Sequence, residues 1–160
     1  MRVVTIGVYG STEDTFFAAL QKAGVEKLID IRQRRGVRGR KYAYVNSQRL
    51  QERLAQIGIG YLHMKQFAPT KEIRELQKQD DERRGISKRE RLTLGEVFTV
   101  EYQKRCLNSY DPNNFIKDVG AETKVIALFC VEGHPKACHR MLVAEFLHKR
   151  LGLEVEHLRS

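Results

Sequence analysis

The chain has 160 residues with 41% hydrophobic content, which is enough for one compact domain and too short for two. Lysine and arginine outnumber aspartate and glutamate by 29 to 20, and the resulting net charge of +9 favours polyanionic partners such as nucleic acid or phosphorylated ligands. No apolar run approaches the roughly 20 residues of a membrane span, and the first residues enter a strand pattern directly, so a soluble, cytoplasmic protein is expected.

The first part of the chain predicts a strand, a helix and a second strand. Residues 2–7 form an apolar, β-branched run, and Ser11 or Thr12 can cap the helix that follows. Gly24 ends this helix, and residues 28–31 form a short second apolar run. Because a helix separates the two strands, we expect them to be parallel and buried.

The next part repeats this plan and then changes character. Asn46 or Ser47 caps a second helix, Gly58 ends it, and residues 59–64 supply a third strand. Residues 70–91 carry mixed charge with few apolar anchors, which predicts a solvated helical excursion.

The last part contains one more helix before a final strand–helix–strand unit. Residues 94–107 are helical in pattern and hold Cys106, which we assign to packing, and residues 110–114 carry a turn signal. A continuous apolar strand at 124–130, a helix at 138–150 and a strand at 153–158 follow. Together these elements predict a single α/β domain over residues 1–160, with three α/β/α layers and a mostly parallel sheet.

The stretch CVEGHPKACHR, residues 130–140, concentrates groups that can carry chemistry. Three cysteines are too few and odd in number for a disulfide framework, so free thiols are expected. Cys130 closes a predicted strand and Cys138 opens the next helix, and ligands of α/β folds collect at that edge of the sheet. A helix N-terminus stabilises thiolates and binds anions, which makes Cys138 a candidate nucleophile or anion-site anchor.

The neighbours of Cys138 fit such a site. His139 and Arg140 add positive charge, and Glu132 or His134 can transfer protons across the loop. Structural alternatives remain open, because Cys130 can belong to the core and Glu132 can pair with Arg140.

Four residues of the same stretch offer soft metal ligands: Cys130, His134, Cys138 and His139. The stretch has no Cys-x-x-Cys knuckle, and the adjacent Cys138 and His139 would point apart on a helix. The spacing therefore predicts no metal site, and no cofactor is predicted.

A second feature is the basic segment IDIRQRRGVRGRKYAYVN, which follows the second strand. It places cations beside tyrosines and contains no acid between Arg32 and Lys41, a mixture suited to phosphates and bases. Asp30 can orient Arg32 toward a ligand phosphate, or the two can form a structural ion pair. We call residues 32–41 of this segment the arginine loop, in which Arg34, Arg35, Arg38 and Arg40 are candidate ligand contacts.

These motifs, taken together, resemble the family of domain of unknown function 488. The resemblance rests on TIG..G at the first strand, D-I-R with its basic loop, GI.Y.H at the third strand, and C.E..P..CHR. It covers nearly the whole chain and implies an α/β layout, without an established activity. The positions that match include Gly7, Gly10 and His63. Family members often have tyrosine or histidine directly after TIG, whereas this chain has Val8 there, followed by Tyr9.

The leading hypothesis is an enzyme of unassigned reaction acting on a phosphate-bearing ligand, either a nucleotide or nucleic acid. Arg140 and Arg32 would stabilise negative charge, while Glu132 or His139 would handle protons. The ligand-binding candidates are Gly7, Tyr9, Gly10, Arg34, Arg35, Arg38, Arg40 and Cys130. The alternatives are a non-catalytic nucleic-acid-binding module that uses the arginine loop and a thiol redox sensor that uses Cys130 and Cys138.

Overall fold

Five strands form one sheet in the order β3-β2-β4-β1-β5 in the computed structural model, which describes all 160 residues. Every pairing is parallel. The strands are β1 (Arg2–Ile6), β2 (Lys27–Asp30), β3 (Gly60–His63), β4 (Val125–Phe129) and β5 (Glu154–His157). The sheet is thus wholly parallel, where the sequence predicts a mostly parallel one.

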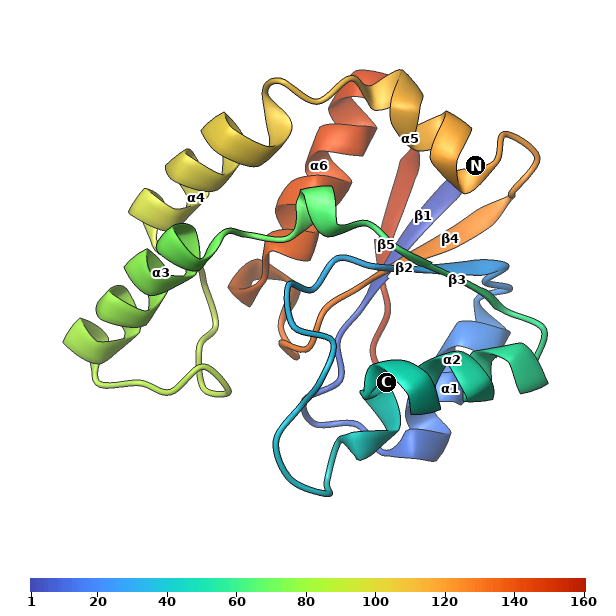
Figure 1. The fold of residues 1–160 in the computed structure, drawn as a ribbon, viewed down its shortest axis with the longest axis horizontal. Coiled ribbons are helices and arrows are strands. Elements are labelled where there is room, and N and C mark those ends of the chain that lie inside the picture. The colour runs from blue at the N-terminus through green and yellow to red at the C-terminus, as the bar shows by residue number, and fades with distance from the viewer.

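Helices cover both faces of this sheet (Figure 1). One face carries α1 (Glu13–Lys22) and α2 (Ser47–Gln56), and the other carries α5 (Pro112–Val119) and α6 (His139–Leu151). Two further helices, α3 (Lys71–Arg84) and α4 (Glu96–Tyr102), pack against each other on the α6 side and extend beyond the sheet. The predicted single α/β domain with three layers is confirmed.

The central strand, β4, is apolar along its whole length because both of its faces are covered. In β4, the residues from Ile126 to Phe129 are fully buried, and β1 and β2 flank that strand on its two sides. Cys106 packs against this core from a π-helical turn, Gln103–Leu107, that continues α4. None of the helices has the length and apolar character needed to cross a bilayer.

Residues 110–114 are not a simple turn, as the sequence pattern suggested, but the start of α5. The Asp111 side chain accepts a hydrogen bond from the backbone N–H of Asn113 at 2.9 Å, and Pro112 occupies the first helical position. An aspartate cap followed by proline is a helix-start signal as well as a turn signal, and here the buried Phe115 and Val119 decide for the helix.

The charged segment 70–91 is helical over α3 and irregular from Gly85 onward, and it is not wholly solvated as the sequence suggested. Ile73, Gln77 and Asp81 recur every four residues on α3 and are buried, and Arg91 beyond the helix is buried as well. Polar residues can be buried when they bond to one another: Gln77 donates to Asp81 at 2.8 Å, and Arg91 donates to Asp81 at 2.7 Å. Residues of the segment, among them Asp81 and Arg91, also line a cavity.

Strand register brings the two chemically rich segments of the sequence to the same edge of the sheet. Asp30 lies opposite Phe129 in the β2–β4 pair, so the residues after each strand leave the sheet side by side. The contact is direct, because His139 Nε2 and the Ile31 carbonyl oxygen are 2.8 Å apart.

Candidate functional site

Asp30 and Arg32 form a buried ion pair at this edge. Arg32 Nε and Nη2 donate to the two carboxylate oxygens of Asp30 at 2.9 and 2.8 Å, and Tyr61 donates its hydroxyl to the same carboxylate at 2.7 Å. Arg32 Nη2 also donates to the Val45 carbonyl, whereas the buried Nη1 has no partner in the protein. The pair fixes the guanidinium plane, and Nη1 is left without a hydrogen-bond partner.

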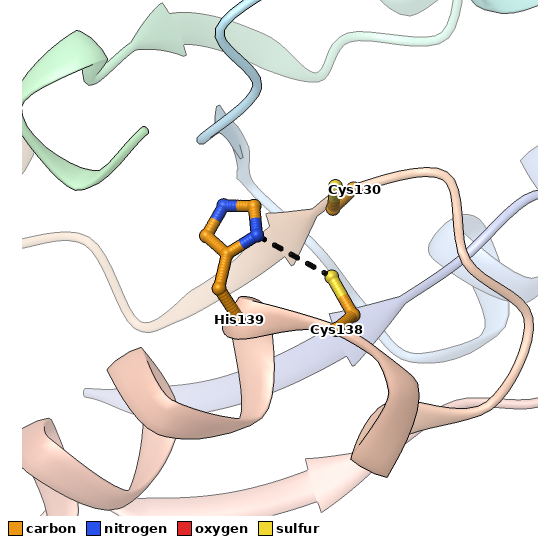
Figure 2. A group of neighbouring side chains, drawn as sticks. All are labelled: Cys130, Cys138 and His139. Carbon is orange, nitrogen blue, oxygen red and sulfur yellow. Dashed lines mark hydrogen bonds between the residues drawn. The ribbon is translucent and has the colours of Figure 1, made fainter. Parts of the chain in front are cut away.

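Three soft side chains meet where β4 ends and α6 begins (Figure 2). Cys130, Cys138 and His139 are each at most 5% exposed, and one ligand atom from each lies within 4.8 Å of the others. Cys138 Sγ is 3.7 Å from His139 Nδ1. This contact is possible because Cys138 is the N-cap residue, with extended φ and ψ of −138° and 144°. The prediction that Cys138 and His139 point apart assumed that both residues are helical, and only His139 is.

Glu132 joins this cluster to the charged segment of the chain. Cys130 Sγ donates to Glu132 Oε2 at 3.1 Å, and Arg91 donates to Glu132 Oε1, also at 3.1 Å. The half-exposed Lys88 ammonium lies 3.5 Å from the same Oε1. Arg91 additionally donates to the Ala137 carbonyl, so it ties the loop between β4 and α6 to α3.

Burial and neighbouring charges set the protonation of these groups. Contact with Cys138, together with burial, raises the pKa of the Cys130 thiol well above its ordinary value. Burial alone would raise the pKa of Glu132, but Lys88, His139 and Arg91 hold it well below its usual range. Burial alone would lower the pKa of His139, and Cys130 and Glu132 instead raise it. Cys130 is therefore a neutral thiol and Glu132 a carboxylate near neutral pH.

Arg140 lies inside the loop between β4 and α6. Its side chain is fully buried, and the guanidinium donates to the backbone carbonyls of Glu132 and Gly133. Gly7 passes directly beneath this loop, where a Cβ atom would overlap the Glu132 carbonyl oxygen. The arrangement gives Gly7 and Arg140 a role in holding the loop that carries Glu132.

Replacing Gly7 by alanine should lower the free energy of unfolding by about 1–3 kcal/mol, because backbone atoms rather than a flexible side chain obstruct the added methyl group. Gly36→Ala is the matched control, since its Cβ would meet only Asn46 Oδ1 at 3.8 Å, an ordinary contact. Urea unfolding of both variants measures the difference. Equal stabilities would mean that the loop moves away from Gly7 without cost.

A cavity of about 690 Å³ opens beside the cluster. Cys130, Glu132 and His139 line it, together with Arg32, whereas Cys138 and Arg140 do not. The opposite wall comes from α3 and the segment that follows it. Cations outnumber acids around the cavity: they are Arg32, Arg34, Arg38, Arg74, Lys78, Lys88, Arg89 and Arg91, against Asp81, Glu82 and Glu132.

Only some arginines of the arginine loop line this cavity. Arg34 and Arg38 line it, while Arg35 and Arg40 are exposed outside its wall. Tyr9 also lines the cavity, and the Arg89 guanidinium carbon lies 5.1 Å from the centre of its ring. Gly10 lies near the same ring system, because its backbone N–H donates to the Tyr42 hydroxyl at 2.9 Å.

A second cavity of about 500 Å³ lies on the other side of the β4–α6 loop. Gly7, Gly10 and His134 line it, and Tyr9 is shared with the first cavity. His134 Nδ1 accepts a hydrogen bond from the Lys136 backbone N–H, and this histidine does not belong to the cluster of Cys130, Cys138 and His139.

His63 lies at the same edge of the sheet, with Nε2 2.8 Å from the Arg32 carbonyl oxygen. The sequence reasoning did not identify Asp81, Lys88 and Arg91, which complete the charged wall of the cavity. The four-residue spacing of Ile73, Gln77 and Asp81 was the one available signal that α3 buries a face. Nothing local to Arg91 indicates that it reaches Glu132, 41 positions away.

Comparison with known proteins identifies the family of the chain. The family described as Domain of unknown function DUF488 matches residues 12–147, so the chain belongs to it. No curated protein and no solved structure matches the chain.

Proposed function

We propose that this DUF488 protein is an enzyme that acts on a phosphate-bearing ligand, a nucleotide or nucleic acid, bound in the 690 Å³ cavity. One observation carries the proposal: the cavity is lined mainly by cations and also by three buried groups that can exchange protons. These groups are Cys130, Glu132 and His139. The volume falls within the range of about 300–1,000 Å³ typical of small-molecule sites.

The charge of the cavity favours an anion. Two of its three acids are already engaged, because Asp81 and Glu132 both bind Arg91. The unpartnered Nη1 of Arg32 and the remaining cations can therefore serve a ligand phosphate. Convergent cations in a concave site also concentrate anions by focusing the electric field.

The placement of the thiols adjusts the roles that the sequence suggested. Cys130 is the thiol that lines the cavity, and Cys138 lies behind it against His139. In this proposal Cys130, Glu132 and His139 face the ligand, and Arg32 stabilises its negative charge. Asp30 orients Arg32, and Arg140 holds the loop.

Two double variants of the arginine loop test the proposal. Arg34→Gln with Arg38→Gln removes two cations of the cavity wall, and Arg35→Gln with Arg40→Gln removes two from the same loop outside it. We expect the first pair to weaken binding of nucleoside mono-, di- or triphosphates at least about tenfold, since hydrogen bonds to charged groups contribute roughly 1.5–3 kcal/mol each. The second pair should change binding much less, as measured by calorimetry at fixed salt.

A non-catalytic nucleic-acid-binding module is the second candidate, favoured by the exposure of Arg35 and Arg40 outside the cavity. It predicts that a single-stranded oligonucleotide binds with a steep salt dependence and that both double variants flatten the slope equally. Such a result, with no binding of free nucleotides, would replace the enzyme proposal by the binding module.

A further inference from the structure

We propose that Cys130, Cys138 and His139 bind a transition-metal ion of the zinc type. The three ligand atoms lie within 4.8 Å of one another in a buried cluster built from the end of β4 and the start of α6 (Figure 2). The proposal goes beyond the phosphate-ligand enzyme and does not depend on it. It also reverses the expectation of no metal, because the spacing argument took Cys138 and His139 to point apart.

The spacing of the ligand atoms fits a tetrahedral ion. Zinc bonds of about 2.3 Å to sulfur and about 2.1 Å to nitrogen place two ligand atoms of a tetrahedron roughly 3.6 Å apart. Cys138 Sγ and His139 Nδ1 are 3.7 Å apart. Cys130 Sγ completes the triangle within the 4.8 Å limit, so small side-chain rotations suffice to bring all three to an ion.

The histidine ring is already oriented for metal binding. Its Nε2 lies 2.8 Å from the Ile31 carbonyl, and a carbonyl only accepts, so this nitrogen carries the proton. The lone pair of a neutral ring is then on Nδ1, the atom that faces Cys138. A metal-bound histidine that donates its other N–H to a backbone carbonyl is a common second-shell arrangement.

A hydrogen bond and the balance of charge also favour the two sulfur atoms as metal ligands. Cys138 Sγ accepts a hydrogen bond from the Arg140 backbone N–H at 3.4 Å, in the first turn of the 13-residue helix α6. On metal binding both thiols lose their protons, and two thiolates cancel the charge of a divalent ion. The centre would thus be neutral overall, which suits its burial. Two sulfurs and an imidazole favour zinc over magnesium or calcium, which prefer oxygen ligands.

Three protein ligands leave a fourth position. Cys130 and His139 line the 690 Å³ cavity, so that position is reachable from the cavity side. Glu132 offers an oxygen ligand on this side, with Oε2 3.1 Å from Cys130 Sγ, and water or a ligand atom can take its place. Three protein ligands with one exchangeable position is the arrangement of catalytic zinc rather than structural zinc.

Titration of the reduced, metal-free protein with Co²⁺ tests the site without any nucleotide, so its outcome is separate from that of the proposed function. We expect one equivalent to bind, with thiolate-to-cobalt charge-transfer absorption and the visible bands of tetrahedral cobalt, and Zn²⁺ should displace it. Cys130→Ser and Cys138→Ser should each abolish the charge-transfer band or weaken binding at least tenfold. Cys106→Ser is the matched control and should leave both unchanged, because Cys106 lies outside the cluster.

Circular dichroism of each variant shows whether it is folded. If a serine variant does not fold, release of one bound metal from the folded wild-type protein by a mercurial reagent still decides the question, since the mercury binds the cysteine sulfurs and frees the metal ion that they held. The proposal is overturned if wild-type protein binds no Co²⁺ or gives no charge-transfer band, or if Cys106→Ser loses the metal as well.

Discussion

Replacing Asp30 by asparagine should lower the free energy of unfolding by about 3–5 kcal/mol, because Arg32 would keep its charge inside the protein without a carboxylate partner. Both side chains are at most 3% exposed, so water cannot take over the lost interaction. The asparagine would also weaken the hydrogen bond from Tyr61, which now ends on Asp30 Oδ2. Urea denaturation monitored by far-UV circular dichroism gives the difference.

Glu13→Gln provides the control for this experiment. Glu13 pairs with Arg49 at 2.9 Å, nearly the same distance as the Asp30–Arg32 pair, but both side chains are well exposed. Its loss should cost about 0–1 kcal/mol, since water and salt screen exposed pairs. If Asp30→Asn and Glu13→Gln cost the same, the buried pair does not hold the edge of the sheet, and a mainly ligand-directed role for Arg32 would follow.

The sequence predicted the strands and most helices because local pattern and tertiary burial agree there. The continuous apolar run that became β4 could only lie between two covered faces, and left-handed glycines such as Gly24 and Gly152 follow the helices as expected. The turn signal at Asp111 and Pro112 was ambiguous by itself. Whether a helix continues from such a pair depends on distant packing partners.

The candidate site was partly predictable for the same reason. The ends of parallel strands meet at one edge, so Asp30, Arg32, Cys130 and Cys138 could be expected near one another. The course of the arginine loop could not be predicted, and it decides that Arg34 lines the cavity whereas Arg35 does not. Asp81, Lys88 and Arg91 were not predicted as site residues, because they reach the site through contacts between segments far apart in the chain.

Arg91 is the clearest of these long-range contacts. Its guanidinium, 6% exposed, donates to Asp81 on α3 at 2.7 Å and to Glu132 after β4 at 3.1 Å. Two further hydrogen bonds, of 3.1 and 3.0 Å, end on the Ala137 carbonyl. One side chain thus joins α3 to the loop that carries Glu132. A second link comes from Leu94, which donates its backbone N–H to the Lys136 carbonyl at 2.9 Å.

Replacing Arg91 by methionine should therefore cost about 3–5 kcal/mol in the free energy of unfolding, because two carboxylates that are mostly buried would lose their partner. Backbone amides of α3 should exchange faster with deuterium than in the wild type, since the loss falls on the attachment of that helix. Arg83→Met, which lies on α3 itself, is the control, because Arg83 is 71% exposed and its pair with Asp80 should contribute about 0–1 kcal/mol. Anion binding should fall with Arg91→Met and persist with Arg83→Met, since α3 supplies Arg74 and Lys78 to the cavity wall. Unchanged exchange of α3 in the Arg91 variant would show that its packing against α4 alone holds the wall in place.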